Sequence, residues 1–300
     1  MNNQSITIEA TGPVMTKRQS LFMLIVKRYM KNKLAVFGLI LFMILVVIFV
    51  LGAGLFVDYE ADAIRHNMEY RNKPPTSAHI FGTDQYGRDV FARVLYGGRV
   101  SLFVGIVTIL LSLAGGSLIG ATAGYFGGKT DNILMRIMDV FLAIPSILLA
   151  ISIVAALGNG MLNLMIALSV SSVPRFARIV RSCILTVKGQ DFVEAARAYG
   201  CRDRKIITYH ILPNAIGPII VQATLSMSTT ILMISSLSFV GLGLPSSIPE
   251  WGSMLASAKE YMRYSPHLII FPGIAIVLAV MAFNLIGDGL RDALDPKLRN

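Results

Sequence analysis

The stretch from Ala123 to Thr130, AGYFGGKT, differs by one residue from a phosphate-binding loop, because Ala123 stands where the first glycine belongs. Such a loop binds nucleotide when it follows a β-strand and opens a helix, so that backbone N–H groups converge on the phosphates. Here a long apolar segment precedes it. We therefore interpret the stretch as a glycine-rich turn carrying Lys129, and we expect no ATP site in this chain.

A second stretch with informative spacing begins at Gln190. Asp191 is a favourable helix N-cap with Glu194 three residues later, and Gly200 is a favourable stop, so a short helix is predicted over 191–200. Its apolar and small residues share one face, namely Phe192, Ala195, Ala196 and Tyr199. That face suits either a partner's groove or the surface of the membrane or bundle, and the residues alone leave both open. Asp203 is expected to cap another short helix that ends near Pro213.

Polar residues also follow one face of an apolar segment in the C-terminal third. They are Gln222, Ser226, Thr229 and Thr230, with Met233 continuing the row. Polar groups at membrane depth usually face a bundle interior or a watery cavity. The row therefore indicates either a translocation pathway or hydrogen bonds between helices.

Residues with the spacing of a catalytic or metal site are missing from the sequence. It contains no H-E-x-x-H, no G-x-S-x-G and no carboxylate pair within an apolar segment. The histidines are scattered, and Cys183 and Cys201 lack the spacing of zinc ligands. We expect no catalytic residues, no cofactor and no metal here, which argues against an intramembrane enzyme.

Membrane spans are the elements that must position these residues. The 300 residues are 54% hydrophobic and only 15% charged, whereas globular domains are about a quarter charged. Crossing a bilayer takes about 20 apolar residues in helical form. The sequence predicts an all-α polytopic bundle of six transmembrane helices, at 34–57, 100–126, 133–157, 161–182, 215–241 and 267–287.

Basic residues set the expected orientation of the chain. The formal charge is +10, and 19 of the 27 Lys and Arg fall on the side that holds both termini. The positive-inside rule then places both termini in the cytoplasm. Because the basic residues flank apolar segments, they fit membrane topology and not nucleic-acid binding. Mid-span positions are expected to be nearly free of charge, which disfavours an ion-coupled secondary transporter or channel.

Small residues at four-residue spacing mark one face of the second predicted span: Ser112, Gly116, Gly120 and Gly124. Another helix can approach such a face closely. In the third span, Arg136 and Asp139 are expected to neutralise each other, since residues three apart are neighbours on a helix.

The 190–214 stretch resembles the signature of the transmembrane subunits of ATP-binding-cassette importers. That signature is Glu-Ala-Ala, three residues, Gly, nine residues, then Ile-x-Leu-Pro. The matching residues are Glu194, Ala195, Ala196, Gly200, Leu212 and Pro213, while His210 replaces the isoleucine. In the family this helix is the coupling helix, which docks on the ATPase. Phe192, Ala195, Ala196 and Tyr199 would then form its contact face.

Further stretches are similar to the C-type permeases of dipeptide, oligopeptide and nickel importers: 79–102, Glu250-Trp-Gly-Ser-Met254, Phe271-Pro-Gly and 283–298. The resemblance runs from Lys17 to Leu298. It implies a type I importer permease fold with four parts: a cytoplasmic tail (1–33), a first span with a long outer loop (34–97), a permease domain (98–288) and a cytoplasmic tail (289–300).

The resemblance also implies partners in the cell membrane. These would be a second, related permease in a heterodimer, two cytoplasmic ATPases that bind the ATP and Mg²⁺, and an extracytoplasmic substrate-binding protein. The expected function is ATP-driven import of dipeptides or oligopeptides by alternating access. Nickel, a metal chelate or an opine is the alternative cargo, and an ATPase-independent secondary transporter is the remaining alternative.

Overall fold

A computed structural model describes residues 21–55 and 57–294. Within those two ranges the chain forms helices and no strand, apart from an isolated antiparallel bridge between Thr83 and Asp89. The predicted all-α fold is confirmed. Lys17, Arg18, Lys297 and Arg299, which contributed to the expected orientation, lie outside the described residues.

The N-terminal half begins with helix α1 and ends with helix α6. In order, its elements are α1 (Leu21–Tyr29), α2 (Lys33–Val46), a π-helical segment (Val47–Gly52), α3 (Ala53–Leu55), a second π-helical segment (Tyr59–Ile64), a 3-10 turn (Met68–Tyr70) and the long helix α4 (Val90–Phe126). Helices α5 (Gly128–Ala143) and α6 (Ser146–Leu157) follow.

The C-terminal half begins with α7 and ends with α12. In order, its elements are α7 (Met161–Lys188), α8 (Asp191–Ala198), α9 (Asp203–Lys205), a π-helical segment (Ile206–Ile211), α10 (Leu212–Phe239), α11 (Trp251–Ala258), a 3-10 turn (Lys259–Tyr261) and α12 (His267–Leu294).

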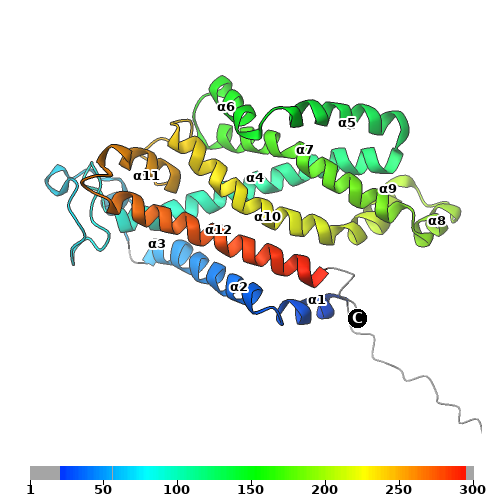
Figure 1. The fold of residues 1–300 in the computed structure, drawn as a ribbon, viewed down its shortest axis with the longest axis horizontal. Coiled ribbons are helices and arrows are strands. Elements are labelled where there is room, and N and C mark those ends of the chain that lie inside the picture. The colour runs from blue at the N-terminus through cyan, green and yellow to red at the C-terminus, as the bar shows by residue number, and fades with distance from the viewer. Residues whose placement is uncertain (1–20, 56, 295–300) are drawn as a thin grey trace, which may run out of the picture.

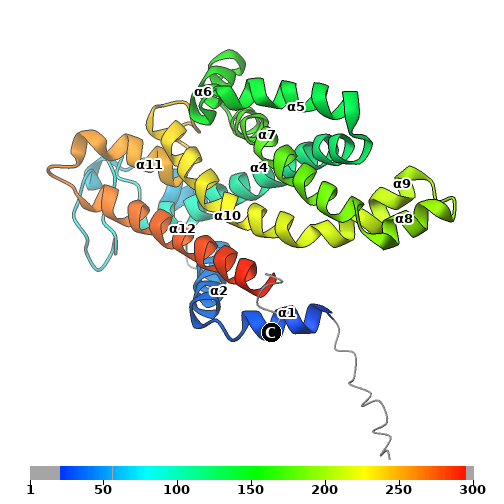
Figure 2. The ribbon, with the colours of Figure 1, turned by 45° about the vertical axis from the view of Figure 1, so that its right-hand side comes forward.

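The long helices run roughly along the length of an elongated bundle (Figure 1). Helix α7 packs along α4, and α12 packs against both α10 and α2. Helices α5 and α6 flank α7 on the side away from α2 (Figures 1 and 2). The short helices α8 and α9 lie at one end, hereafter the α8 end, and α11 lies at the other, hereafter the α11 end.

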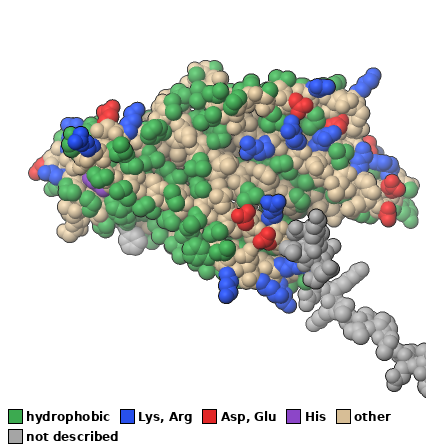
Figure 3. Space-filling view, in the orientation of Figure 1, with side chains coloured by type: hydrophobic (Ala, Val, Ile, Leu, Met, Phe, Trp, Pro, Cys, Tyr) green, Lys and Arg blue, Asp and Glu red, His purple; other side chains and the backbone are tan. Residues whose placement is uncertain are grey.

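Four helical stretches have the length and apolarity to cross a membrane: Lys33–Leu55, Val90–Phe126, Asp203–Phe239 and His267–Leu294. Each contains most of one predicted span. Hydrophobic side chains cover much of the left and central part of the face in Figure 3, and charged side chains lie at its left tip and over its right half. This distribution is that of a protein whose solvent along its sides is lipid.

The span predicted over 133–157 is broken into two helices. Helices α5 and α6 meet at 88°, and only the two together have the length and apolarity to cross a membrane. Ile144 between them is extended (φ −93°, ψ 128°). The cause is Pro145, which lacks an N–H and disfavours helical geometry at the residue before it. Pro174 and Pro218, in contrast, lie inside the continuous helices α7 and α10.

Helix α7 corresponds to the predicted span at 161–182 but has 28 residues, 161–188. It falls outside the four apolar stretches because its second half contains Arg175, Arg178 and Arg181. Arg175 lies at the midpoint of the helix.

Candidate functional site

Helix α8 is the short helix expected over 191–200. It begins one residue earlier than the capping pattern suggested: its N-cap is Gln190, which makes no side-chain capping bond, and Asp191 is already helical. Gly200 adopts a left-handed conformation (φ +74°), and Cys201 N–H donates to the Ala196 carbonyl. Gly200 is thus confirmed as the stop signal, because glycine adopts this conformation without a side-chain clash.

The two sides of α8 differ in exposure. Phe192, Ala195 and Tyr199 face solvent, and Tyr199 is 90% exposed. Ala196, expected on the same face, is instead buried, and so is Val193, for which no role was predicted from the sequence. The correction follows from helix geometry, because Val193 and Ala196 are three residues apart and share the side turned toward the rest of the chain.

A buried cluster holds α8 in place. Val193 and Ala196 pack with Val180 and Ile184 of α7 and with Ile206 of the π-helical segment 206–211. Nearby, the Tyr125 hydroxyl donates to the Asp203 carboxylate, and Lys188 Nζ donates to the Tyr125 carbonyl at 2.5 Å. The helix is therefore anchored on one side and open on the other.

The second short helix does not stop at Pro213. Helix α9, the π-helical segment 206–211 and α10 form one continuous stretch from Asp203 to Phe239. Pro213 lies in the first turn of α10, where a missing N–H costs little. Asp203 is the first residue of α9, and Arg202 holds the N-cap position. Leu212 is half-buried and Pro213 exposed.

The polar row on α10 lies near the middle of that helix. Gln222 Nε2 donates to Ser226 Oγ at 3.0 Å, while the hydroxyls of Thr229 and Thr230 donate to the Ser226 carbonyl at 2.9 and 2.8 Å. Ser226 and Thr230 are buried and Thr229 is exposed. Together with residues of α6 and α7, these three border a small pocket.

The small-residue row of α4 faces α7. Ser112 Oγ donates to the Thr108 carbonyl of its own helix at 2.7 Å and reaches the Ser169 carbonyl of α7 at 3.4 Å. A side chain at Gly116 would collide with Phe176, and one at Gly120 would collide with the Ala177 carbonyl. Gly124 approaches Arg181 and Ile184 in the same way. The two backbones could not approach so closely with larger residues on α4.

The expected pairing of Arg136 with Asp139 was wrong. Asp139 Oδ1 accepts from Arg178 Nη2 of α7 at 2.8 Å, and Asp131 binds Arg181 at 2.5 Å. Asp131 and Asp139 are eight residues apart and so lie on the same face of α5. That face is turned to the arginines of α7.

The stretch resembling a phosphate-binding loop joins two helices. Its first four residues end α4, and Gly127 and Gly128 take positive φ values of 67° and 55° before α5 continues. The residue pattern therefore follows a helix where a phosphate-binding loop would follow a strand.

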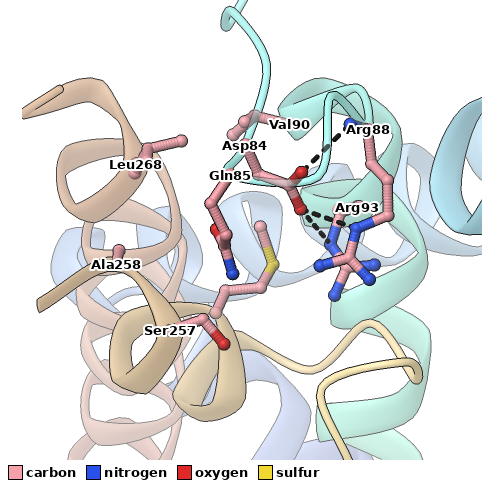
Figure 4. Close-up of a pocket in the computed structure, with 9 residues that line it drawn as sticks. Asp84, Gln85, Arg88, Val90, Arg93, Ser257, Ala258 and Leu268 are labelled. Atoms are coloured by element: carbon pink, nitrogen blue, oxygen red, sulfur yellow. Dashed lines mark hydrogen bonds and ion pairs between the residues drawn. The ribbon is translucent and has the colours of Figure 1, made fainter. Parts of the chain in front are cut away.

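A buried ionic network at the α11 end was not predicted from the sequence (Figure 4). Asp84 Oδ2 accepts from Arg88 Nε at 2.7 Å and lies 3.6 Å from Arg93 Nε. Both arginines also donate to the Ser246 carbonyl, at 3.1 and 2.9 Å, and Arg93 donates to the Ala63 carbonyl at 2.8 Å. Asp84 and Arg88 lie in the turn before α4 and not on a helix, so their four-residue spacing alone did not suggest the pair.

Glu250 is a second buried charge at this end. Its carboxylate caps α11 by accepting from the N–H groups of Gly252 and Ser253 at 2.7 and 2.8 Å, and Ser101 Oγ approaches it at 3.3 Å. Burial raises the pKa of Glu250 above its ordinary value, while these hydrogen bonds act in the opposite direction. The adjoining Trp251 is fully buried, and its indole N–H donates to the Val94 carbonyl at 3.0 Å.

In the part of the chain that the structure describes, no group of three or more His, Cys, Asp and Glu side chains could hold a metal ion. The arrangement thus offers a short helix with an exposed face at one end, a braced set of loops at the other and a polar pocket between them.

These features are those of a membrane permease of an ABC importer, and the chain belongs to that class. Residues 116–300 match the family described as the inner membrane component of binding-protein-dependent transport systems. Residues 20–75 match the N-terminal transmembrane domain of oligopeptide transport permease C. The recognition of a C-type permease from sequence is confirmed.

Individual relatives narrow the class further. The chain is 44% identical over 274 residues to the dipeptide transport system permease DppC of Alkalihalophilus pseudofirmus, covering 91% of this chain and 89% of that protein. It is 43% identical over 274 residues to the glutathione transport system permease GsiD of Pectobacterium atrosepticum, covering 91% and 90%. A structure of the MetNI methionine ABC transporter in an inward-facing conformation matches with a TM-score of 0.56 at 20% identity, covering 68% of this chain and 97% of that one. That match supports the type I importer permease fold.

Proposed function

We propose that this chain imports short peptides, dipeptides first, as one of two permease subunits in an ATP-driven importer. The proposal of peptide cargo rests on the two relatives, whose names give a dipeptide and glutathione as cargo. A nickel or metal-chelate cargo finds no support in these relatives. The second subunit would be a related permease, and a substrate-binding protein would deliver the peptide.

The observation that carries the mechanism is the exposed face of α8. An eight-residue helix is anchored through Val193 and Ala196, yet it presents Phe192 and Tyr199 to solvent. Exposed aromatic side chains on an anchored helix are typical of a docking surface. We infer that α8 is the coupling helix and that Phe192, Ala195 and Tyr199 contact the ATPase, while Ala196 supports the helix from behind.

In this mechanism, ATP closes the two ATPases, α8 moves with its ATPase and the bundle changes from inward-facing to outward-facing. ATP and Mg²⁺ are bound by the ATPases, and this chain carries no catalytic residue. The α8 end and both termini then face the cytoplasm, in agreement with the excess of Lys and Arg on that side. Gln222, Ser226, Thr229 and Thr230 are the proposed lining of the pathway.

The two family matches support a division of the chain into two parts. The first span and the outer loop, within 34–97, form an N-terminal extension, and the permease domain covers 98–288. Cytoplasmic tails at 1–33 and 289–300 complete the proposal, with α1 inside the first of them.

The test is to tag the chain in its native host, extract it in mild detergent and identify the proteins that co-purify by mass spectrometry. Recovery of a second permease and ATPases, together with uptake of labelled dipeptide that depends on this chain, is the expected result. A Gly200→Val variant should lose the ATPases and keep the second permease. Recovery of a folded chain without ATPases from wild type would contradict the proposal and favour an autonomous transporter.

A further inference from the structure

The midpoint of α7 presents a charge whose role the coupling mechanism leaves unexplained. Arg175 is exposed, and it lies about 20 Å along the helix from either end of α7, given about 1.5 Å per residue. A charged side chain at that position in a membrane helix is costly, and such residues usually face a cavity where they have a task.

The other two arginines of this part of α7 are already neutralised. Arg178 binds Asp139 and Arg181 binds Asp131, so each arginine that faces α5 has an acidic partner on it. One turn further toward the middle, α5 has ended at Ala143 and the chain turns by 88° into α6. Among the described residues, no carboxylate forms an ion pair with Arg175.

Arg175 instead borders a small pocket that is shared by three helices. The other polar residues of its lining are hydroxyls: Ser146, Ser171, Ser172, Ser226, Thr229 and Thr230. Ser171 and the three residues of α10 are engaged with backbone carbonyls or Gln222. The hydroxyls of Ser146 and Ser172 carry no such hydrogen bond and are available as donors.

The start of α6 adds backbone donors to the same pocket. Ser146 is the first residue of this 12-residue helix, and its N-cap, Pro145, has no side-chain group that could accept from the first turn. The first N–H groups of a helix lack partners within it, and they carry partial positive charge. A broken helix that turns this end toward a cavity provides a site for an anionic group.

We propose that Arg175, with the N-terminus of α6 and the hydroxyls of Ser146 and Ser172, binds the C-terminal carboxylate of the peptide during its passage. The inference rests on the proposed function, since the peptide supplies the carboxylate. A guanidinium provides two parallel donors to a carboxylate, and the helix end adds further donors. The exposed Thr229 and half-buried Met233 border the same pocket and would contact the rest of the peptide.

The test uses the complete importer reconstituted in lipid vesicles, with peptide-loaded binding protein at saturating concentration. Arg175→Gln should lower dipeptide uptake by roughly 10- to 100-fold, the loss expected for a hydrogen-bonded charged pair. Assembly with the second permease and stimulation of ATP hydrolysis should be retained. Arg175→Lys should recover part of the uptake, and the matched control Arg178→Gln, one turn away, should stay within about twofold of wild type.

Three results would overturn the site. Uptake by Arg175→Gln within about twofold of wild type would show that the charge is not needed. Loss of the second permease or of stimulated ATP hydrolysis in that variant would show that Arg175 pairs with a carboxylate of the partner subunit and not with that of the peptide. An absence of peptide uptake by wild type would refute the proposed function, and the site with it.

A second measurement locates the peptide directly. The purified complex, without binding protein, is irradiated with a dipeptide that carries a photoreactive N-terminal side chain and a free carboxylate. Cross-links are expected on α6, α7 or α10 near the pocket, and they should be at least about tenfold weaker in Arg175→Gln than in Arg178→Gln. The C-terminal amide should compete at least about tenfold less well than the free acid. Equal competition by the two peptides would exclude a carboxylate site.

Discussion

Charged side chains are buried and paired at the α11 end, whereas aromatic side chains stand in solvent at the α8 end. Arg88 is 2% exposed and Glu250 is fully buried, and both have partners within the chain. Tyr199 is 90% exposed and Tyr209 is 73% exposed. The buried pairs show that the loops of the α11 end are held by the chain itself, while the exposed face at the α8 end is where the proposed ATPase would dock.

Among the tests of this difference between the two ends, the largest effect on stability is expected for Arg88→Met. This change leaves Asp84 buried without its 2.7 Å partner, and breaking a buried pair costs about 3–5 kcal/mol. We expect a clear drop in the thermal unfolding temperature of the purified chain in detergent. Arg65→Met, at an exposed position in the same loop, is the matched control and should change little. A variant as stable as wild type would mean that the network does not brace this end.

A smaller loss of stability and a larger loss of function are expected for Gly200→Val. A β-branched residue at φ +74° adds about 1–3 kcal/mol of local strain, although its Cβ would meet no neighbouring atom. Peptide uptake should be abolished while membrane insertion is preserved. Gly200→Asn, which tolerates the left-handed conformation, should retain much of the uptake. Normal uptake by the valine variant would refute the role of α8.

The ionisation of Glu250 gives a prediction about pH. Because burial raises its pKa above 4.5, the folded chain holds the proton at higher pH than the unfolded chain does. The stabilisation from this group is present below the unfolded pKa and is lost as pH rises through the folded pKa, by about 1.4 kcal/mol for each pH unit that separates the two pKa values. Glu250→Gln cannot ionise, so its melting temperature relative to wild type should rise between acidic and neutral pH. The exposed control, Glu260→Gln, should show no such trend. If the melting temperatures of Glu250→Gln and wild type changed with pH in parallel, the prediction would be refuted.

The smallest effect on stability is expected for Tyr199→Ser. A side chain that is 90% exposed contributes less than about 0.5 kcal/mol to folding, so the melting temperature should not change. Retention of the ATPases during purification should nevertheless fall several-fold, as for an aromatic residue at an interface. Tyr264, which is 82% exposed at the α11 end, provides the matched control, and the Tyr264→Ser variant should retain the ATPases. Equal retention by both variants would remove the proposed distinction between the ends.

Regular helix and its end signals were predictable from the sequence, since they depend on local residues. The apolar segments located most of the long helices, and Gly200 marked the end of α8. Pro145 was visible too, but its consequence, an 88° turn, depends on whether neighbouring helices accept a break, as the continuous helices around Pro174 and Pro218 show.

Side-chain partners were less predictable, because they depend on which faces meet in space. Asp139 had an apparent partner three residues away and bound Arg178, 39 residues later, instead. Ala196 had the spacing of a contact residue and turned inward. Arg175 was counted with the basic residues beside the membrane, and only the length of α7 reveals its central position.

The continuous helical run from Asp203 to Phe239 links the α8 end directly to the polar residues of α10, so that a tilt at one end moves the other. Asp203 lies four residues after Tyr199, and Thr229 is 26 residues beyond Asp203, about 39 Å along a helix. A rigid rod of that length tilted by about 5° displaces its far point by about 3 Å, roughly the length of one hydrogen bond. In the proposed mechanism, small movements of an ATPase at α8 would therefore be sufficient to form or break contacts at the polar pocket.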